Sequence, residues 1–290
     1  MSAHPCIVFI GGGNMCEAIL SGLLKTGHPT SHVRVSEPFD QRREVLRKTY
    51  GIDVFADNND AISGAGEQVS AAKPDVVVLA VKPQVVGEVV RGVSGSLQRT
   101  RPLVISIVAG VAIKDFARWI HQDGPASVPL VRLMPNTPAL VGEGAAGMFA
   151  DADVSDEQRK QTEYVVRNIA KEYFWVDSES GVDAVCAVSG SGPAYFFLMI
   201  EALEKTGVEM GLPADVAKRL AAQTALGAAK MVLTSDDDVA LLRSKVTSPN
   251  GTTHAAIQRM IAEKVPEGIA SGVLACRARC TTLSEEFGKL

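Results

Sequence analysis

An apolar run that ends in glycines at the start of the chain constrains the fold more than any other feature. Residues 6–10 (Cys-Ile-Val-Phe-Ile) contain no charged side chain, as expected of a strand buried on both faces of a parallel sheet. Residues 11–15 (Gly-Gly-Gly-Asn-Met) follow, and a small, apolar helical pattern continues to residue 24. This order of strand, glycine turn and helix predicts a unit that binds a dinucleotide.

The glycines of this turn have separate tasks in that prediction. Gly11 permits the tight turn, and Gly13 lets the backbone approach a pyrophosphate held at the helix N-terminus. Cys16 replaces the third glycine of the usual pattern. Because that position packs the helix against the strand, a small thiol is tolerated there.

The next predicted strand bears on which dinucleotide binds. Residues 33–36 (Val-Arg-Val-Ser) form it, and Glu37 follows where an acidic residue accepts hydrogen bonds from the adenine ribose. Glu37 favours a free 2′-hydroxyl, whereas Ser36 with Arg42 or Arg43 would suit a 2′-phosphate. A solvated helix face is the commoner place for such arginines. These residues therefore leave NAD and NADP both open.

Three further apolar runs, 75–81, 103–108 and 131–134, predict buried strands, and a last strand is expected at 173–176. Ligands of open α/β sheets bind beyond the carboxyl ends of the strands. The residues just after the three runs are therefore candidates, although a solvated charge explains the lysine equally well. They are Lys82, Ala109, Pro135 and Asn136.

Composition places the chain among soluble globular proteins. It has 290 residues, 46% of them hydrophobic and 21% charged, with a formal net charge of −4. No basic stripe predicts a nucleic-acid partner, no apolar run approaches the ~20 residues of a membrane span, and nothing N-terminal resembles a signal peptide. The five cysteines include no Cys-x-x-Cys pair. We expect a cytoplasmic protein with reduced, mostly packed thiols and no metal site.

The strand patterns disappear after about residue 178. Apolar residues at helical spacing predict helices over 195–210, 214–233 and 266–287. An all-helical segment of this size with several apolar faces could complete its core against a second copy, which predicts a homodimer; packing within one chain is the alternative. We divide the chain into a dinucleotide-binding domain, 1–178, and a helical domain, 179–290.

Two hydroxyl-rich turns stand out in the helical half. Residues 189–195 (Ser-Gly-Ser-Gly-Pro-Ala-Tyr) precede a helix, for which an interdomain hinge is the plain alternative. In residues 246–253, Pro249 and Gly251 force a turn, and Asn250 tolerates left-handed geometry. A helix follows, so free N–H groups and the positive end of its dipole would suit a carboxylate or phosphate. An ordinary capped turn is the alternative. The hydroxyls come from Ser248, Thr252 and Thr253.

No motif in the chain predicts a side-chain nucleophile or a bound metal. A His-Glu-x-x-His pattern and a nucleophile elbow are both absent from the sequence, and the five histidines are dispersed. The triplet 236–238 (Asp-Asp-Asp) is most often a solvated cap for the helix that follows. The cofactor would therefore carry the chemistry.

Five motifs, in this order, resemble those of pyrroline-5-carboxylate reductases: 11–15, 80–83 (Ala-Val-Lys-Pro), 134–138 (Met-Pro-Asn-Thr-Pro), 189–195 and 246–253. The resemblance covers residues 5 to 287. It implies an α/β protein in which an N-terminal Rossmann dinucleotide-binding domain precedes an all-helical C-terminal dimerisation domain, with dimers often assembled into rings such as a decamer. It also implies reduction of a cyclic imine to proline with NADPH or NADH, NADPH slightly favoured.

The resemblance also implies roles for single residues. The carboxylate of the substrate would be held at Ser248, Thr252 and Thr253, and the Thr253 hydroxyl would lie near the ring nitrogen as the catalytic residue. The cofactor positions by similarity are Gly11, Gly12, Gly13, Asn14, Met15, Ser36, Asn58, Ala80, Lys82, Ala109, Pro135 and Asn136.

Some positions depart from the family pattern. Asn250 stands where glycine is usual, and Cys16 where glycine or alanine is common. Pro38 stands where many members have a phosphate-binding arginine, which weakens the case for NADP. The Gly/Ala-rich connection 62–73 is longer than in many members and has no assigned role.

Two other functions need weighing. A β-hydroxyacid dehydrogenase also pairs a Rossmann domain with a helical domain, but it needs a lysine four residues before an asparagine on the helix after its second-domain glycine turn. Residues 195–205 contain no such pair. A non-catalytic nucleotide-binding module would leave the hydroxyl-rich turns of the helical half without a role.

Overall fold

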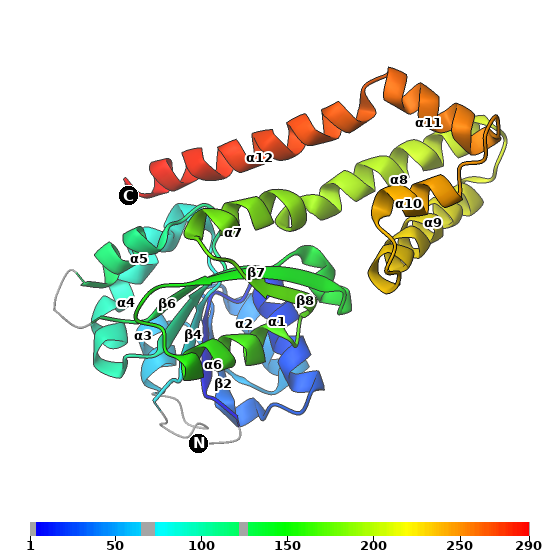
Figure 1. Cartoon of the computed structure of the whole chain (residues 1–290). Coiled ribbons are helices and arrows are strands. Elements are labelled where there is room, and N and C mark those ends of the chain that lie inside the picture. The colour runs from blue at the N-terminus through cyan, green and yellow to red at the C-terminus, as the bar shows by residue number, and fades with distance from the viewer. Residues whose placement is uncertain (1–3, 65–72, 122–126, 290) are drawn as a thin grey trace. The chain divides into compact units, whose positions relative to one another are not determined.

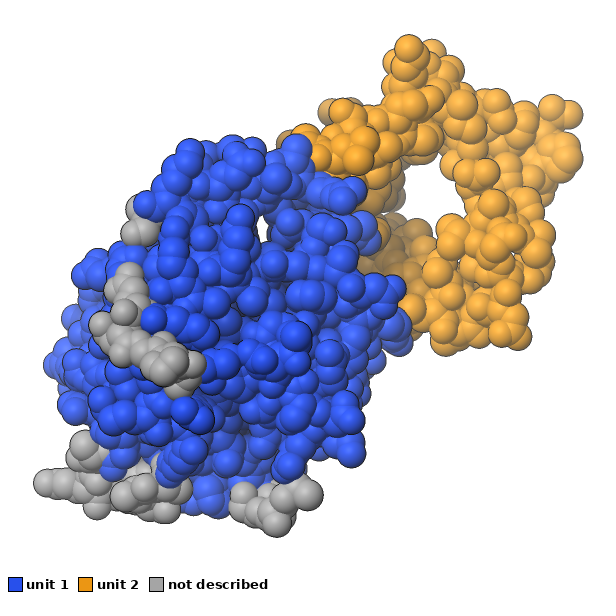
Figure 2. All heavy atoms as spheres, turned by 60° about the vertical axis from the view of Figure 1, so that its left-hand side comes forward, with its two compact units in different colours: residues 1–190, 276–290 blue, residues 191–275 orange. Residues whose placement is uncertain are grey.

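The computed structural model describes residues 4–64, 73–121 and 127–289. The chain divides into two compact units, residues 1–190 with 276–290 and residues 191–275 (Figure 2). The last turns of the C-terminal helix thus belong to the first unit. Most of the connection 62–73 lies outside the described residues, which omit 65–72.

The first unit is built on an eight-stranded sheet with the strand order β3-β2-β1-β4-β5-β6-β7-β8. Neighbouring strands from β3 to β6 are parallel, β7 is antiparallel to β6, and β8 is parallel to β7. The order reverses between β1 and β4, which is the switch point where Rossmann folds bind dinucleotides. The strands are β1 Ile7–Ile10, β2 Val33–Ser36, β3 Asp53–Phe55, β4 Val76–Leu79, β5 Leu103–Ser106, β6 Leu130–Met134, β7 Gly144–Ala150 and β8 Ala170–Trp175.

Apolar residues of the central strands face two separate cores, one on each side of the sheet. In β1, Ile7 and Phe9 belong to one core, whereas Val8 and Ile10 belong to the other. All four are 0% exposed. The prediction that residues 6–10 form a strand buried on both faces is therefore confirmed.

Helices cover both faces of this sheet (Figure 1). Residues of α1, α2 and α6 pack in the first core, and residues of α3, α4 and α5 pack in the second. The helices of the first unit are α1 Asn14–Lys25, α2 Asp40–Tyr50, α3 Asn58–Ser63, α4 Val86–Thr100, α5 Ile113–Ile120, α6 Asp156–Val166 and α7 Glu179–Val185. Shorter turns are η1 Thr30–His32, η2 Pro83–Val85, η4 Thr137–Val141 and the π-helical η5 Cys186–Gly190.

The second unit contains helices only, within the residues described. They are α8 Gly192–Glu209, α9 Ala214–Thr234, α10 Val239–Lys245, α11 Thr252–Ala262 and, as far as Ala275, the first part of α12. Helix α12 as a whole spans Val265–Phe287. A Cβ placed on Gly207 would lie 3.1 Å from the Cβ of Ala217, so small residues bring α8 and α9 close together. The predicted cap is confirmed, because the Asp238 side chain accepts a hydrogen bond from Leu241 N at 2.8 Å and opens α10.

An apolar helical stretch, Glu179–Glu209, has the length and composition of a membrane span, with a mean hydropathy of 1.3. Only 17% of the apolar window is buried in one copy of the chain. Phe197 and Leu198 on α8 are 65% and 68% exposed. A single helix of this kind is weak evidence for a membrane, and an interface with another protein chain explains the same exposed face.

Candidate cofactor and substrate sites

The glycine turn lies where the first, second and fourth strands end. Gly11 has a φ of +101°, and a Cβ there would stand 2.7 Å from the carbonyl oxygen of Ala80. Its N–H donates to the carbonyl of Ser36 at 2.9 Å. Both the positive φ and the close approach demand glycine, as predicted for the tight turn.

The residues after Gly11 leave room for an anion. Gly13 is the N-cap of α1, and no atom lies within 4 Å of a Cβ placed on it. Gly13 and Asn14 are both exposed, so the first-turn N–H groups of α1 face open space at the positive end of its dipole. This cradle, which a side chain would fill, fits the pyrophosphate of a dinucleotide.

Cys16 packs the helix against the sheet as expected. It is 1% exposed and belongs to the core that contains Ile7 and Phe9 of β1. Burial raises the pKa of its thiol well above the usual range. Cys16 is therefore a small packing residue and takes no part in the chemistry.

Glu37 holds the glycine turn in place, a role that the sequence did not reveal. Its Oε2 accepts a hydrogen bond from the N–H of Gly12 at 3.0 Å, and its Oε1 accepts one from the N–H of Phe39 at 3.1 Å. The side chain is buried, with 7% of the residue exposed. Glu37 thus places one carboxylate beside the end of β2, where the ribose of a dinucleotide binds.

Ser36 and Asn58, both predicted cofactor residues, lie together. The Ser36 hydroxyl donates to Oδ1 of Asn58 at 2.7 Å, which joins the end of β2 to the start of α3. The two arginines of α2 are engaged by the protein. Arg42 donates to the carbonyl of Gly12 at 2.7 Å and pairs with Glu17 at 2.6 Å.

Arg43 is held in a similar way. It donates to the carbonyl of Glu37 at 2.9 Å and pairs with Asp40 at 2.8 Å. Both guanidinium groups therefore have carboxylate partners, and neither side chain is a fully solvated charge, since the side chains are 27% and 14% exposed.

The other strand-end candidates come from β4, β5 and β6. Ala80 donates its N–H to the carbonyl of Ile10 at 2.9 Å, which keeps the end of β4 beside the glycine turn. Lys82 is exposed at the N-cap of η2, and Ala109 is half-buried. Met15 is also half-buried, at the start of α1.

Asn136 joins the end of β6 to the turn that precedes α8. Pro135 and Asn136 are both buried. The Asn136 side chain accepts from the N–H of Ala145 at 2.9 Å and donates to Oγ of Ser189 at 3.2 Å. Two motifs that are far apart in the sequence thus meet within the first unit.

A partly buried ion network between β6 and α7 was missed from the sequence. Arg132 on β6 reaches Glu179 and Asp183 of α7, each at 3.0 Å, and its side chain is 5% exposed. Removing one partner of such a network would leave an uncompensated buried charge. The signal was present in the strand 131–134, where one arginine interrupts apolar residues on an otherwise buried element.

The turn at 246–253 has the geometry that its sequence predicts. Gly251 donates its N–H to the carbonyl of Ser248 at 3.0 Å, and Asn250 has a φ of +60°. Pro249 therefore occupies the second turn position and Asn250 the left-handed third position.

Helix α11 begins directly after this turn. Its N-cap is Gly251, which has no side chain to cap the helix, so the first-turn N–H groups are left for another acceptor. The nearby hydroxyl residues Ser248, Thr252 and Thr253 are exposed. This arrangement suits an anion and disfavours the ordinary capped turn.

The fold and the glycine cradle define a dinucleotide-binding protein of the Rossmann class. Residues 6–110 match the family described as NADP oxidoreductase, coenzyme F420-dependent, and residues 179–283 match the pyrroline-5-carboxylate reductase dimerisation family. A curated pyrroline-5-carboxylate reductase from Pseudomonas aeruginosa is 40% identical over 98% of this chain and 99% of its own length. A second, from Haemophilus influenzae, is also 40% identical, over 98% of this chain and 99% of its own length. The chain therefore belongs to the pyrroline-5-carboxylate reductase family.

Solved structures agree with this assignment. A pyrroline-5-carboxylate reductase from Coxiella burnetii superposes with a TM-score of 0.85 at 35% identity, over 97% of this chain and 98% of that one. The Plasmodium falciparum pyrroline carboxylate reductase, solved with NADP bound, gives a TM-score of 0.82 at 25% identity over 97% of this chain and 98% of that one. The predicted fold, with its helical dimerisation domain, is confirmed.

Proposed function

We propose that this chain reduces the cyclic imine 1-pyrroline-5-carboxylate to L-proline with a hydride from NADPH or NADH, the last step of proline synthesis. The observation that carries the proposal is the turn Ser248–Gly251, which leads into the uncapped N-terminus of α11 in a chain of this family. A substrate with a carboxylate needs a site of this kind, in which hydrogen-bond donors have no acceptor within the protein. A non-catalytic nucleotide-binding module has no use for this site, and a β-hydroxyacid dehydrogenase would need the lysine and asparagine pair that residues 195–205 lack.

The chain's own residues have three tasks in this reaction. Ser248, Thr252 and Thr253 bind the carboxylate through hydroxyl and backbone N–H groups, which fixes the position of the imine ring. Fixing two reactants in register supplies up to about 7–11 kcal/mol of barrier reduction. The Thr253 hydroxyl hydrogen-bonds the ring nitrogen and helps to keep its proton in place, because a free hydroxyl is too weak an acid to protonate it unaided.

We assign the predicted cofactor positions to the cradle of the first unit. Gly11 to Met15 hold the pyrophosphate, Ser36 and Asn58 the adenosine region, and Ala80 and Lys82 the neighbouring strand end. Ala109, Pro135 and Asn136 border the nicotinamide. The bound nicotinamide supplies the hydride, and the protein orients the acceptor.

The slight preference for NADPH stays a prediction, and Glu37 is the residue expected to limit it. Both arginines of α2 already have carboxylate partners, so the Glu37 charge would oppose a 2′-phosphate. The variant Glu37→Gln keeps an acceptor for Gly12 N and removes that charge. We expect it to raise the ratio of kcat/KM for NADPH to that for NADH about threefold or more, since one screened charge contact is worth about 0.5–1 kcal/mol. An unchanged ratio would remove Glu37 from cofactor choice.

The organisation of the whole protein follows from the same assignment. We keep residues 1–178 as the cofactor domain and 179–290 as the domain for substrate binding and dimerisation. The family that matches the helical half is described as a dimerisation family, and we propose further assembly of dimers into a ring such as a decamer. We also propose a cytoplasmic protein that binds neither nucleic acid nor membrane, in keeping with its net charge of −4 and its five cysteines without a disulfide.

Oxidation of NADPH in the presence of 1-pyrroline-5-carboxylate tests the proposal directly. We expect turnover with the imine and none with NADP and 3-hydroxyisobutyrate, the substrate of a β-hydroxyacid dehydrogenase. The variant Thr253→Ala should lower kcat/KM for the imine by about tenfold or more, the loss of about 1.4 kcal/mol. Turnover of the alcohol without turnover of the imine would overturn the function, and an unchanged kcat/KM in the variant would overturn the role of Thr253.

A further inference from the structure

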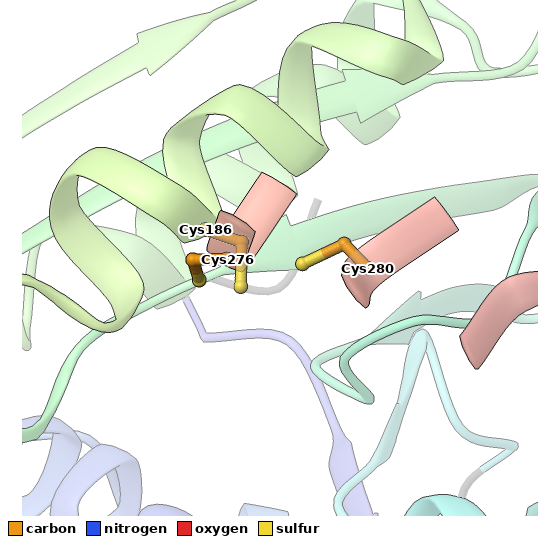
Figure 3. Close-up of side chains that lie close together, drawn as sticks. All are labelled: Cys186, Cys276 and Cys280. Carbon is orange, nitrogen blue, oxygen red and sulfur yellow. The ribbon is translucent and has the colours of Figure 1, made fainter. Parts of the chain in front are cut away.

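Three cysteine side chains from distant parts of the sequence gather at one point of the first unit. Cys186 lies on η5, and Cys276 and Cys280 lie one helical turn apart on α12. Their Sγ atoms are all within 4.8 Å of one another, and Figure 3 shows the sulfur of Cys280 directed toward the other two. Within residues 4–64, 73–121 and 127–289, this is the one group of three or more cysteine, histidine or acidic side chains close enough to share an ion.

The surroundings of the three thiols are apolar and rich in sulfur. Cys186 and Cys280 are 8% and 5% exposed and share a cluster with Met134 and Val182. A Cβ placed on Gly190 would lie 3.2 Å from Sδ of Met134 and 3.5 Å from Sγ of Cys186, so both sulfur atoms border the same small space. Thiol and thioether donors together prefer soft metal ions to hard ones.

Burial keeps the Cys280 thiol protonated in the absence of an ion, as it does the Cys16 thiol. Burial raises the pKa of the Cys280 thiol to about 12, and a hydrogen bond with Cys186 adds to the shift. Without an ion this thiol is neutral and packs like a small apolar side chain. An ion would displace protons from the thiols, so its affinity should rise with pH.

We propose that Cys186, Cys276 and Cys280 bind one soft, thiolate-preferring metal ion of the Zn²⁺, Cd²⁺ or Cu⁺ kind. Each metal–sulfur bond forms as an S–H bond breaks and its proton passes to solvent, with no change of oxidation state. Three sulfurs at about 2.3 Å from one ion stand about 4 Å apart, so only small side-chain rotations separate the observed cluster from a bound site. Cys276, the one of the three that is not buried, gives the route of entry.

The ion would fasten α12 to η5 of the first unit. Leu283 and Phe287 of α12 already pack against the sheet's second core. Ser189, which accepts a hydrogen bond from the Asn136 side chain, lies three residues after Cys186. An ion at the cysteines therefore joins the C-terminal helix to the element that carries this contact, and binding should stabilise the folded unit.

Titration of the reduced, full-length protein with Cd²⁺ tests the proposal. Binding to thiolates gives an ultraviolet charge-transfer band, which we expect to saturate at one ion per chain and to be displaced by a large excess of Zn²⁺ but not by the same excess of Mg²⁺. The variant Cys276→Ser changes the most accessible ligand, and its fold can be checked by circular dichroism. It should lower the Cd²⁺ affinity at least about tenfold and abolish the rise of Tm that Cd²⁺ gives the unmodified protein.

The variant Cys16→Ala is the matched control, because Cys16 is a buried thiol in a different core from Cys186 and Cys280. It should bind Cd²⁺ like the unmodified protein. Absence of the band, an equal affinity in Cys276→Ser, or displacement by Mg²⁺ as readily as by Zn²⁺ would each overturn the proposal, and the cysteines would then be packing residues only.

Discussion

Gly13 allows the cofactor cradle to be tested with one methyl group. Its φ of −74° is open to any residue, and a Cβ there meets no protein atom within 4 Å. In Gly13→Ala the methyl group would enter the space left for the pyrophosphate. We expect KM for NADPH to rise about tenfold, equivalent to about 1.4 kcal/mol of binding, with little change in Tm.

Gly92→Ala is the control for this measurement. Gly92 lies in α4, and a Cβ there likewise meets no atom within 4 Å. Steady-state kinetics should show an unchanged KM for NADPH in this variant. If the two variants raised KM equally, the cradle would not be where the pyrophosphate binds.

His28 makes the stability of the protein depend on pH. It is 3% exposed, and its Nδ1 lies 2.8 Å from the hydroxyl of Tyr164. Burial lowers the pKa of its imidazole to about 4. Between that pKa and the unfolded value near 6.5, the unfolded chain binds the proton and the folded chain does not. The free energy of unfolding should therefore fall as the pH drops from about 6.5 to about 4, by about 1–3 kcal/mol.

Urea midpoints at about pH 5 and about pH 7 measure this dependence. The variant His28→Gln should lose much of the difference between the two midpoints. His254→Gln, at a half-buried position of the second unit, should keep it. An unaltered difference in His28→Gln would assign the pH dependence to other groups.

At the scale of single elements, α8 is the helix that a partner copy should cover. Its Phe197 is 65% exposed, and the matching family is described as a dimerisation family. An aspartate in place of a buried phenylalanine loses about 1.5–3 kcal/mol of apolar burial and adds a charge to desolvate. Because the change occurs in both copies, Phe197→Asp should weaken the dimer by about 100-fold or more.

Sedimentation at micromolar concentration measures this loss of dimer affinity, because it separates dimers from single chains. Val141→Asp is the control, since Val141 is 76% exposed and lies on η4 of the first unit. It should sediment like the unmodified protein. A Phe197→Asp protein that kept its size would place the interface elsewhere.

The elements also show how far sequence patterns reach. Buried strands such as β1 and β4 followed from continuous apolar runs, because parallel strands covered on both faces carry no polar alternation. Strand β7, Gly144–Ala150, was not predicted, since its Gly-Ala-Ala-Gly sequence has low β propensity. Its small residues have a tertiary cause: a Cβ on Gly147 would lie 2.4 Å from the Val185 side chain on α7.

At the scale of the whole molecule, order along the chain predicted more than any local pattern. The glycine turn, the strand ends and the two hydroxyl-rich turns were each ambiguous alone, and their sequence and spacing indicated the family. Contacts between distant segments could not be predicted in this way. The link from Asn136 to Ser189, the Arg132 network and the three clustered cysteines depend on how α7, η5 and α12 pack, which no local spacing encodes.

The central claim is that the turn before α11 selects the substrate by its carboxylate. Comparing kcat/KM for 1-pyrroline-5-carboxylate with that for 1-pyrroline, the same ring without the carboxylate, tests it most directly. In Ser248→Ala with Thr252→Val, loss of two hydrogen bonds to a charged group should cost about 3 kcal/mol. We predict a fall of about 100-fold for the carboxylate substrate and less than about threefold for 1-pyrroline, with Thr224→Val on α9 unchanged for both. An equal fall for the two substrates would contradict the claim.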